Sequence, residues 1–445
     1  MPRPPARHRP KSKPRPSAVP LELTVESVGA RGDGLAHYAG QRVYIPLVLP
    51  GERVRVRLGQ PRGDGLAAEL LEVLEPSPDR NAPPCRHYGA CGGCGLQHWA
   101  DLGYAEWKTA QVRQALARAG LEDAPVEPVR RTPPASRRRA TFVARRLGRK
   151  VHLGFNARGS HRIVEVEACH IVVPAIAAIL APLRDLLGRV LPDGEGADIH
   201  VAQLAHGLDM LLNGPPALDL AAREALAAFA HAQDLTRLSW QPPGGLPEPV
   251  AVRRRAEAVF SGVPVSLAPG AFLQASAAGE AALVEAVLAA VGPAARVADL
   301  FAGSGTFTFA LARTAQRVLS VESEPGAHAA VATAARTHGL GDRIEARRRD
   351  LDSDPLSGDE LKGFDAIVFD PPRAGARAQT AALAESRVPR LVAVSCNPAT
   401  LARDLRILVE GGYRLEGVQP IDQFVWSPHI EVVARLTRSG DNLSR

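Results

Sequence analysis

The feature that most constrains this chain is an alternation of strands and helices that begins at Ala294. Apolar runs long enough for buried strands occur at residues 297–301, 317–321, 364–369, 391–394 and 429–436, and a further strand starts at Ile344. Alternation of this kind is typical of a largely parallel sheet with helices on both faces. We therefore predict a Rossmann-like α/β domain over residues 269–445.

A glycine turn follows the first of these strands. Gly303 and Gly305 lie between strand and helix, where the backbone must come close to a ligand. Glu322 ends the next strand, near the spacing at which an acid binds a ribose hydroxyl pair. No Lys-Ser or Lys-Thr pair follows the glycines, and the third glycine of the dinucleotide pattern is missing. The turn therefore favours S-adenosylmethionine over NAD or a nucleoside triphosphate as the cofactor, with Gly303 in its pocket.

Two aspartates end later strands of the same domain. Asp350 is placed to reach the adenine end of the cofactor, and an ordinary strand-terminating Asp is the alternative. Asp370 is followed by two prolines and Arg373, and it is a candidate to hold the cofactor or a uracil, with a rigid proline turn as the alternative. Enzymes that methylate exocyclic amines carry an aromatic residue at the position of Arg373, so the motif disfavours amine methylation.

Cys396 presents a thiol where the fifth strand ends, at the edge where open α/β sheets do chemistry. The C5 atom of uracil is a poor nucleophile, but a thiolate that adds to C6 creates an enolate whose C5 can attack a methyl sulfonium. A base must then remove the C5 proton. Glu431, flanked by apolar residues in the last strand, is the best candidate. A structural cysteine and a solvated glutamate are the alternatives.

The other four cysteines have the spacing of metal ligands. They are Cys85, Cys91, Cys94 and Cys169. Four thiolates suit an iron-sulfur cluster or tetrahedral zinc, and spacing alone does not separate the two. Glycines between the first three favour tight wrapping around a metal. An odd cysteine count with this clustering argues against a secreted disulfide framework.

The first half of the chain divides by composition. Residues 20–77 read as short alternating strands with glycine turns and predict an OB-like β-barrel. Residues 78–268 mix Arg-rich strands with Ala/Leu-rich helices and predict an α+β domain that carries the metal site. Residues 1–19 form a basic tail for which we predict disorder. Six of its residues are basic and none is acidic, so that without them the net charge of +7 becomes +1.

This charge distribution implies that nucleic acid would be held by local patches and a flexible arm, whereas a solvated leader is the alternative for the tail. No signal peptide or membrane-spanning segment is recognisable, which predicts a cytoplasmic protein. No obligate protein partner is evident.

Together these motifs resemble the RNA 5-methyluridine (uracil-C5) methyltransferase family, most closely bacterial 23S rRNA members with an N-terminal TRAM barrel and a [4Fe-4S] cluster. The resemblance covers residues 20–437. Its motifs are Leu49 to Glu52, Cys85 to Gln97, Phe272 to Gln274, Asp299 to Phe307, Asp370 to Gly375, Ser395 to Pro398 and His429 to Val432. The chain departs from the family at Ser276 and Thr306, where Asn is common, and at Thr333 to Ala335, where an Asn-Ala pair is usual.

The resemblance implies a class I methyltransferase fold in the C-terminal domain and iron in the metal site. It also implies a cofactor pocket lined by Gln274, Phe301, Glu322, Asp350 and Asp370, and Phe272 beside a flipped target base. The target uracil would have to leave its stem to reach Cys396. The barrel and the arginines at positions 137, 138, 139, 145, 146 and 149 would contact phosphates, with a solvated sheet face as the alternative for the arginines.

A TRAM barrel together with a cluster favours 23S rRNA over tRNA as the substrate, because the tRNA-specific relative is shorter and lacks both. Two alternatives stay open. One is the same chemistry on tRNA. The other is a metal-stabilised RNA-binding or assembly protein with a vestigial methyltransferase domain.

Overall fold

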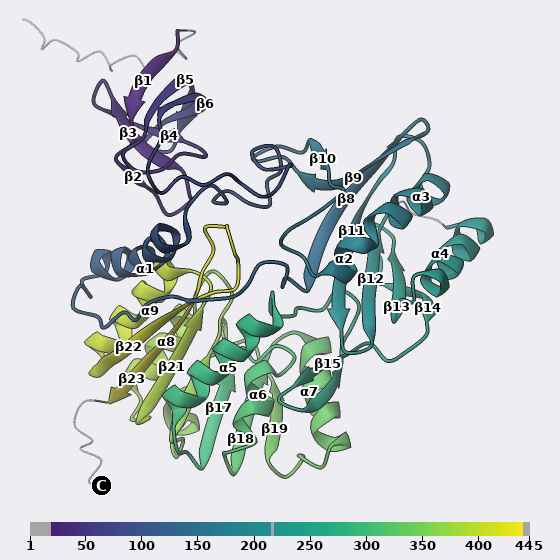
Figure 1. The fold of residues 1–445 in the computed structure, drawn as a ribbon. Helices are drawn as coiled ribbons and strands as arrows, with labels where there is room; N and C mark the ends of the chain where they lie inside the picture. Colours follow the sequence, from purple (N-terminus) through teal and green to yellow (C-terminus); the bar gives the residue numbers. More distant parts are fainter. Residues whose placement is uncertain (1–18, 215–217, 439–445) are drawn as a thin grey trace, which may run out of the picture. The chain divides into compact units, whose positions relative to one another are not determined.

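The computed structural model describes residues 19–214 and 218–438 and divides into two compact units (Figure 1). The first comprises Met1–Ala82 and Gly95–Ala100, and the second Pro83–Cys94 and Asp101–Arg445. The predicted basic tail lies outside the described residues, apart from Val19 at its end. Within the described part of the chain, no helix combines the length and the apolar character needed to cross a bilayer.

The first unit contains a six-stranded sheet in the order β1-β5-β6-β4-β3-β2. The strands are β1 Leu21–Thr24, β2 Ser27–Val28, β3 Gly34–Tyr38, β4 Gln41–Ile45, β5 Arg53–Arg62 and β6 Gly65–Glu75. β1 and β2 are at opposite ends of this order, yet only Val25 and Glu26 separate them in sequence. The sheet must therefore curve until its ends approach each other. Its alternate residues, such as Val54 and Val56, form a buried core.

The second unit contains a seven-stranded sheet in the order β10-β9-β8-β11-β12-β13-β14. The strands are β8 Arg139–Leu147, β9 Lys150–Asn156, β10 Ile163–Glu165, β11 Gly196–Leu204, β12 Gly207–Asn213, β13 Arg237–Gln241 and β14 Glu248–Val252. The helices α2 Pro174–Ala178, α3 Leu180–Val190 and α4 Leu220–Ala232 pack against it and share its apolar core. We call this the central sheet. A hairpin of β15 Glu257–Phe260 and β16 Val263–Ser266 follows it.

The C-terminal sheet has eight strands in the order β19-β18-β17-β20-β21-β23-β22-β7. They are β7 Arg130–Arg131, β17 Arg296–Leu300, β18 Arg317–Glu322, β19 Ile344–Arg348, β20 Ala366–Phe369, β21 Arg390–Ser395, β22 Tyr413–Asp422 and β23 Glu431–Arg438. The strands from β17 to β21 pair in parallel, and β23 pairs antiparallel with β21 and β22. The predicted strands therefore form, and the mixed α/β class is confirmed.

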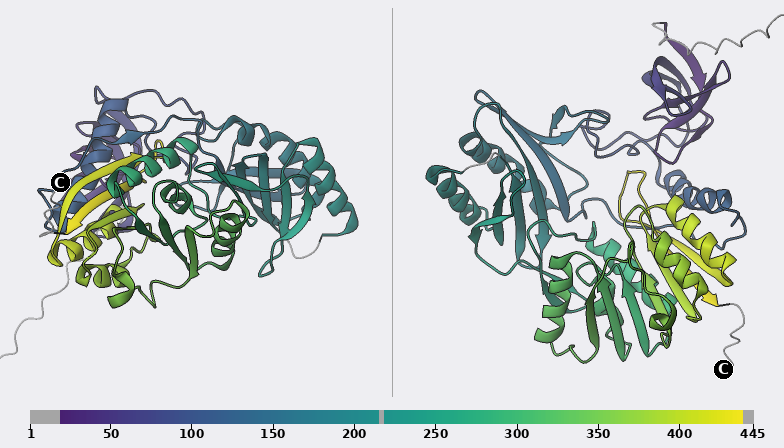
Figure 2. Two further views of the ribbon diagram at one scale, coloured as in Figure 1. Left: turned by 90° about the horizontal axis from the view of Figure 1, so that it is seen from below. Right: turned by 180° about the vertical axis from the view of Figure 1, so that it is seen from behind.

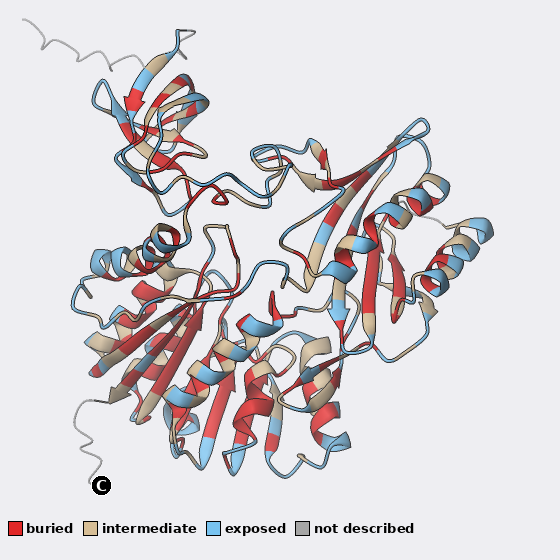
Figure 3. Ribbon diagram, in the orientation of Figure 1, coloured by how far each residue is buried: buried red, intermediate tan, exposed pale blue. Residues whose placement is uncertain are grey.

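Helices cover both faces of the C-terminal sheet (Figure 2). They are α1 Asp101–Arg118, α5 Ala277–Val291, α6 Thr306–Leu311, α7 Pro325–Thr337, α8 Arg377–Glu385 and α9 Pro398–Glu410, with a 3-10 turn at Gly358–Leu361. Ile367 and Phe369 pack into the core on one face, and Ala366 and Val368 into the core on the other. This alternation follows the two-residue period of a strand. Because both faces are covered, the inner strands β17, β18, β20, β21 and β23 are mostly buried, whereas the edge strands β19 and β7 are more exposed (Figure 3).

Two elements from the region between residues 78 and 268 join this C-terminal sheet. α1 packs on α9 and β22, and β7 is the edge strand beside β22. Lys108 of α1 has no exposed surface and pairs with Asp422 at the end of β22, with 2.9 Å between Nζ and Oδ1. This ion pair connects two segments of the second unit that are about 300 residues apart in the sequence. The predicted domain boundaries remain a prediction.

Candidate active site at the ends of the parallel strands

The parallel strands of the C-terminal sheet end at one edge, and the predicted site residues gather there. Five predicted residues lie at the C-terminal ends of five different strands. Glu322 is the last residue of β18, and the others come shortly after the ends of β17, β19, β20 and β21: Gly303, Asp350, Asp370 and Cys396. The sheet order makes these strand ends neighbours. In open α/β sheets this edge is where ligands bind. The structure therefore brings the predicted cofactor residues and the predicted nucleophile into one region.

The glycine turn between β17 and α6 is held by the acid that was predicted to bind ribose. Gly303 N donates to Glu322 Oε2 at 2.8 Å, and Glu324 N donates to Glu322 Oε1 at 2.7 Å. Gly305 has a φ of 96°, and a Cβ there would lie 2.6 Å from the Phe309 ring. Only glycine fits this position without displacement. Nothing lies within 4 Å of the place where a Cβ of Gly303 would be, so that the turn offers open backbone to a ligand.

Asp350 is exposed at the next strand end. Its carboxylate accepts from Ser353 Oγ at 2.8 Å and from Asp352 N at 3.1 Å, and these bonds lower its pKa. Arg349 N donates to Glu322 O at 3.1 Å, which ties this loop to the end of β18. Asp350 is therefore ionised and lies beside Glu322, and its carboxylate can accept further hydrogen bonds in addition to these two.

Asp299 is a buried acid that the sequence interpretation left without a role. It has no exposed surface, and Thr308 Oγ1 donates to its Oδ2 at 2.5 Å. Burial raises its pKa to about 7, the Thr308 hydrogen bond opposes this, and the charge of Asp370 adds to it. Its Oδ1 has no hydrogen-bond partner among the described residues. One acid inside an otherwise apolar strand was the signal that could have identified it.

The predicted nucleophile and base stand beside each other across two antiparallel strands. Ser395 of β21 pairs with Val432 of β23, and the next residues on the two strands are Cys396 and Glu431. The pKa of the Cys396 thiol is raised to about 11, mainly by burial and then by the charges of Glu431 and Asp370, whereas the charge of Arg373 opposes this rise. Three acidic or nucleophilic groups thus share one electrostatic environment.

Asp370 and Glu431 interact directly through their charges. Glu431 is 6% exposed, and burial followed by the charge of Asp370 raises its pKa. Asp370 keeps some exposed surface, but protein atoms surround its carboxyl closely, and this burial raises its pKa. Two carboxyls in this situation hold a proton more tightly than free carboxyls do. Glu431 can therefore accept a proton near neutral pH.

Gln423 lies between Glu431 and Gln274, and no sequence pattern indicated it. Its Nε2 donates to Gln274 Oε1 at 2.7 Å and to Glu431 Oε1 at 3.2 Å. Its Oε1 accepts from Ala275 N at 3.0 Å. The predicted cofactor contact Gln274 is therefore connected to the predicted base through one buried amide.

Phe272 and Arg139 form a second feature of the site. Phe272 is 63% exposed, and the guanidinium carbon of Arg139 lies 4.8 Å from its ring centroid. Both residues line a cavity of about 210 Å³. Burial lowers the pKa of Arg139 to about 10, which still leaves it charged at neutral pH. An exposed ring of this kind can stack on a base.

The other predicted phosphate-binding arginines do not form one free face. Arg138 pairs with Glu280 and donates through Nε to Gln274 O at 3.1 Å, and Arg146 donates to two backbone carbonyls. Arg145 and Arg149 are exposed. In the first unit, three arginines of β5 pair with glutamates of β6. These pairs are Arg53–Glu75, Arg55–Glu72 and Arg57–Glu69. That row is internally neutralised.

The four predicted metal ligands are partly buried cysteines of the second unit. The charges of Cys169 and Cys85 act on Cys91, and those of Cys94 and Cys169 act on Arg137. Gly92 N donates to Asn156 O at 2.9 Å, and a Cβ on Gly92 would lie 2.7 Å from that oxygen. Among the described residues, however, no three His, Cys, Asp or Glu side chains are arranged closely enough to be recognised as a metal site.

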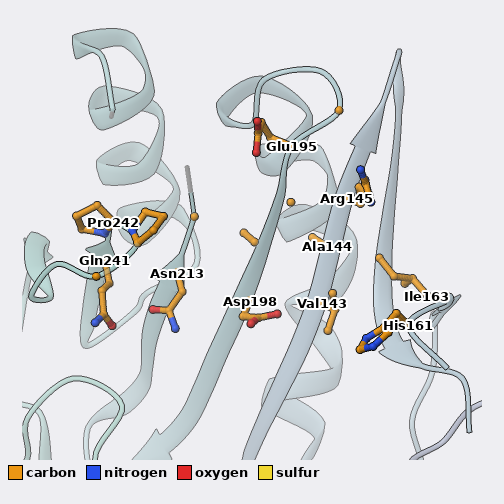
Figure 4. Close-up of a pocket in the computed structure, with 16 residues that line it drawn as sticks. Val143, Ala144, Arg145, His161, Ile163, Glu195, Asp198, Asn213, Gln241 and Pro242 are labelled. Atoms are coloured by element: carbon orange, nitrogen blue, oxygen red, sulfur yellow. The ribbon is translucent and has the colours of Figure 1, made fainter. Parts of the chain in front are cut away.

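A separate groove of about 650 Å³ lies on the central sheet and contains none of the predicted catalytic, cofactor or metal residues, although Arg145, one of the predicted phosphate contacts, lines it (Figure 4). Polar side chains from several strands and loops line it. They include Arg145, His161, Glu195, Asp198, Asn213 and Gln241. Its lining carries both signs of charge, so that it is not a basic phosphate site by itself.

Comparisons with known proteins place the chain among RNA methyltransferases. The model of the tRNA (uracil-5-)-methyltransferase family matches residues 265–439. An uncharacterized RNA methyltransferase of Brucella suis is 44% identical over 94% of this chain and 98% of the relative. The 23S rRNA (uracil(1939)-C(5))-methyltransferase RlmD of Aeromonas salmonicida is 34% identical over 93% of this chain and 95% of the relative. The chain therefore belongs to the RNA (uracil-5-)-methyltransferase family, and the prediction of an RNA methyltransferase enzyme is confirmed.

The fold has a solved counterpart. The Pyrococcus abyssi tRNA (uracil-54, C5)-methyltransferase, crystallised with S-adenosyl-L-homocysteine, superimposes with a TM-score of 0.73. The match covers 94% of this chain and all of that one, at 20% sequence identity. The likeness supports the mixed α/β fold with several sheets.

Proposed function

We propose that the protein transfers a methyl group from S-adenosylmethionine to C5 of a uridine in 23S rRNA through a covalent adduct between Cys396 and C6. The observation that carries this proposal is the position of Cys396 and Glu431 at the same end of the β21–β23 pair, with Asp370 acting on both. The relative named for 23S rRNA, which matches nearly the whole chain, supports the rRNA substrate.

The chemistry needs a nucleophile and a base. The Cys396 thiol loses its proton, and the thiolate adds to C6 of the uracil to form an enolate. C5 then attacks the donor methyl group, and S-adenosylhomocysteine leaves. Glu431 takes the proton from C5, the C5–H electron pair forms the C5=C6 double bond, and the C6–S bond returns its electrons to sulfur. The balance is one methyl group gained and one proton released.

The strand ends fit the methyl donor. The open turn at Gly303 and the carboxylates of Glu322 and Asp350 suit a nucleoside. Burial raises the pKa of Asp370, which favours the uncharged form of its carboxyl beside a bound ligand. Phe301, with a φ of 59°, and Gln274 are assigned to the same pocket. When bound, S-adenosylmethionine supplies an electrophilic methyl sulfonium. The family assignment supports this cofactor.

The four clustered cysteines are proposed to hold a [4Fe-4S] cluster. Their donor set is all thiolate, which iron-sulfur clusters and zinc both accept. The charges that Cys85 and Cys169 exert on Cys91 support a shared site, and so does the close backbone approach at Gly92. The cluster would connect the loop over residues 83–94 to the segment around Cys169. This role is structural, and the cluster takes no part in the proposed reaction.

The remaining predictions become part of this proposal. Residues 20–77 are proposed to be an OB-like TRAM barrel, which the curved six-stranded sheet supports. Residues 78–268 are proposed as the central domain and 269–445 as the methyltransferase domain, in a cytoplasmic protein without a membrane or obligate protein partner. Phe272 is proposed to lie beside the flipped uracil.

The decisive experiment offers labelled methyl from S-adenosylmethionine to separate pools of unmodified rRNA and tRNA, with nucleoside analysis of the product. Labelled 5-methyluridine in the rRNA pool alone supports the proposal. Label in tRNA alone would keep the chemistry and replace the substrate. No label in either pool, from protein that carries its full metal content, would contradict the proposed reaction.

A further inference from the structure

Gln423 is a buried amide whose orientation is fixed by the backbone. The residue is 3% exposed and directly follows Asp422, the last residue of β22. Its Oε1 accepts from Ala275 N at 3.0 Å. A backbone N–H can only donate, so the amide oxygen must face Ala275 and the amide nitrogen must face the other way.

The amide nitrogen serves two acceptors at once. It carries two hydrogens, and the structure gives it two oxygen partners, Gln274 Oε1 and Glu431 Oε1, at 2.7 and 3.2 Å. The first partner is the proposed cofactor contact and the second is the proposed base. The bond to Oε1 leaves Glu431 Oε2 to take a proton from a substrate.

Both ends of this bridge are anchored. The carboxylate of Asp422 accepts from Lys108 Nζ at 2.9 Å and from Tyr104 Oη at 2.7 Å, and all three residues are buried. On the other side, Arg138 Nε donates to Gln274 O at 3.1 Å. Gln423 therefore cannot turn away without breaking contacts on both sides.

We propose that Gln423 is a positioning residue that connects the cofactor contact Gln274 to the base Glu431, so that binding of the methyl donor aligns the base for removal of the C5 proton. The inference rests on the proposed covalent mechanism. The step that it aligns is the transfer of the C5 proton to Glu431, which re-forms the C5=C6 bond and expels the Cys396 thiolate.

The charges around Glu431 agree with this role. Asp370 favours the protonated form of Glu431, whereas the Gln423 hydrogen bond and the charges of Arg139 and Arg373 favour the carboxylate and lower its pKa. Gln423 is the one among these that donates a hydrogen bond directly to the carboxylate in the described structure. Loss of the amide should therefore slow proton removal more than methyl transfer.

The first test compares Gln423→Met with Gln379→Met. Gln379 is a matched control, because it is also buried and both ends of its amide are also hydrogen-bonded: its Oε1 accepts from Leu356 N and its Nε2 donates to Leu356 O, at 2.9 Å each. It lies on α8, outside the proposed machinery. With methyl-labelled donor and RNA, we measure the label in denaturation-resistant protein–RNA adduct against the label in free 5-methyluridine. Donor affinity is measured separately by calorimetry.

Gln423→Met is expected to raise the adduct fraction by roughly tenfold or more, since general-base steps contribute about 10²–10⁴ in rate. The Kd for S-adenosylmethionine should rise by about 2- to 10-fold, the value of one hydrogen bond. Gln379→Met should keep the wild-type adduct fraction and Kd. A Gln423→Met enzyme that is slower, but has the same adduct fraction and Kd as Gln379→Met, would overturn the inference.

A second variant covers the case in which Gln423→Met does not fold. Gln423→Glu has nearly the same shape, can donate one hydrogen bond when protonated and repels Glu431 when ionised. Its adduct should resolve more slowly as pH rises, opposite to the wild type, whose base ionises as pH rises. The same pH trend in both proteins would also overturn the inference. If wild type and Glu431→Gln never yield any adduct, the covalent mechanism itself fails, which is a distinguishable result.

Discussion

Cys396 and Glu431 are the first residues beyond the last pair of the antiparallel β21–β23 ladder, on the same side of that pair. Neighbouring strands lie about 4.8 Å apart. A flat ring held across the two strand ends can therefore have one of its atoms near a side chain of one strand and the adjacent atom near a side chain of the other. In the proposed reaction, a uracil held there would present C6 to the thiol and the C5 proton to the carboxyl. The register of two strands thus sets the spacing that the proposed reaction needs.

The first prediction separates the two roles. Cys396→Ala should abolish methyl transfer, because no other described residue of the site can form the bond to C6. Glu431→Gln should form the bond and fail to release it, so that a methylated protein–RNA adduct survives denaturation while turnover falls by roughly 10²–10⁴. Gel retention of labelled RNA under denaturing conditions measures this. Glu416→Gln, which changes a partly buried glutamate of β22 outside the proposed site, is the control. Adduct-free turnover at the wild-type rate in Cys396→Ala would exclude the mechanism.

The second prediction concerns the reactivity of the thiol. With its pKa near 11, Cys396 should react with iodoacetamide about tenfold faster for each pH unit between 7 and 10, since the thiolate is the reactive form. Glu431→Gln removes a negative charge that raises this pKa, so alkylation should become faster, most clearly at a pH where Glu431 is ionised. Arg373→Met should act in the opposite sense. Mass spectrometry of the Cys396 peptide reports the rate. Equal rates in all three proteins would contradict these electrostatics.

Much of the site could be predicted because it depends on local rules. The proposed residues from Gly303 to Cys396 lie at or just after the C-terminal ends of strands that the sequence predicts, and parallel strands bring such ends together whatever the rest of the chain does. Gly305 had to be glycine for a steric reason that is visible in sequence as a glycine turn. Glu431 was found because an acid among apolar residues is rare.

The parts that escaped prediction depend on partners far away in sequence. In the sequence, nothing distinguishes Lys108 from a lysine on the surface of a helix. Only the folded chain shows that Lys108 is buried and paired with Asp422. Gln423 carries no charge and belongs to no motif, so its bridge from Gln274 to Glu431 becomes visible only when three segments meet. The contacts of Arg138 and Arg146 also escaped prediction, because Glu280, Gln274 and Leu191, which accept from them, lie in other segments of the chain. Phosphate contact by the arginines stays a prediction.

The third prediction tests the buried ion pair between α1 and β22. Lys108→Met leaves the Asp422 carboxylate buried without its cation, which should lower the free energy of unfolding by about 3–5 kcal/mol. The double variant Lys108→Met/Asp422→Asn should recover part of this loss, because no unpaired charge remains. Urea unfolding followed by far-UV circular dichroism measures both. Arg406→Met, which breaks an exposed pair with Glu410, should leave stability nearly unchanged. Equal losses for the buried and exposed pairs would contradict the prediction.

The fourth prediction concerns the proposed cluster. Anaerobically purified protein should contain iron and absorb visible light, and Cys169→Ser should lose both. Cys396→Ser removes a thiol outside the proposed ligand set and should keep the wild-type iron content, which makes it the matched control. Metal analysis and visible spectra of the three proteins provide the measurement. Zinc in place of iron would replace the cluster with a zinc site, and no metal in any of them would remove the metal site from the proposal.

The last prediction uses the raised pKa of Asp299. Its folded-state pKa is about 7, whereas an unfolded aspartate titrates near 3.9. Between these values the folded protein holds a proton that the unfolded chain has released, so this group makes the protein less stable as pH rises from about 4 to 7 and has no further effect above that.

Asp299→Asn cannot titrate, so the free energy of unfolding of the variant relative to the wild type should increase by up to a few kcal/mol over the same interval. Chemical unfolding at pH 4.5, 5.5, 6.5 and 7.5 gives this difference directly. Asp359→Asn, an exposed aspartate whose pKa is lowered by Lys362, should give no increase there. A difference between Asp299→Asn and wild type that stays constant with pH would mean that Asp299 is ionised in the folded protein, in which case Thr308 alone stabilises a buried charge.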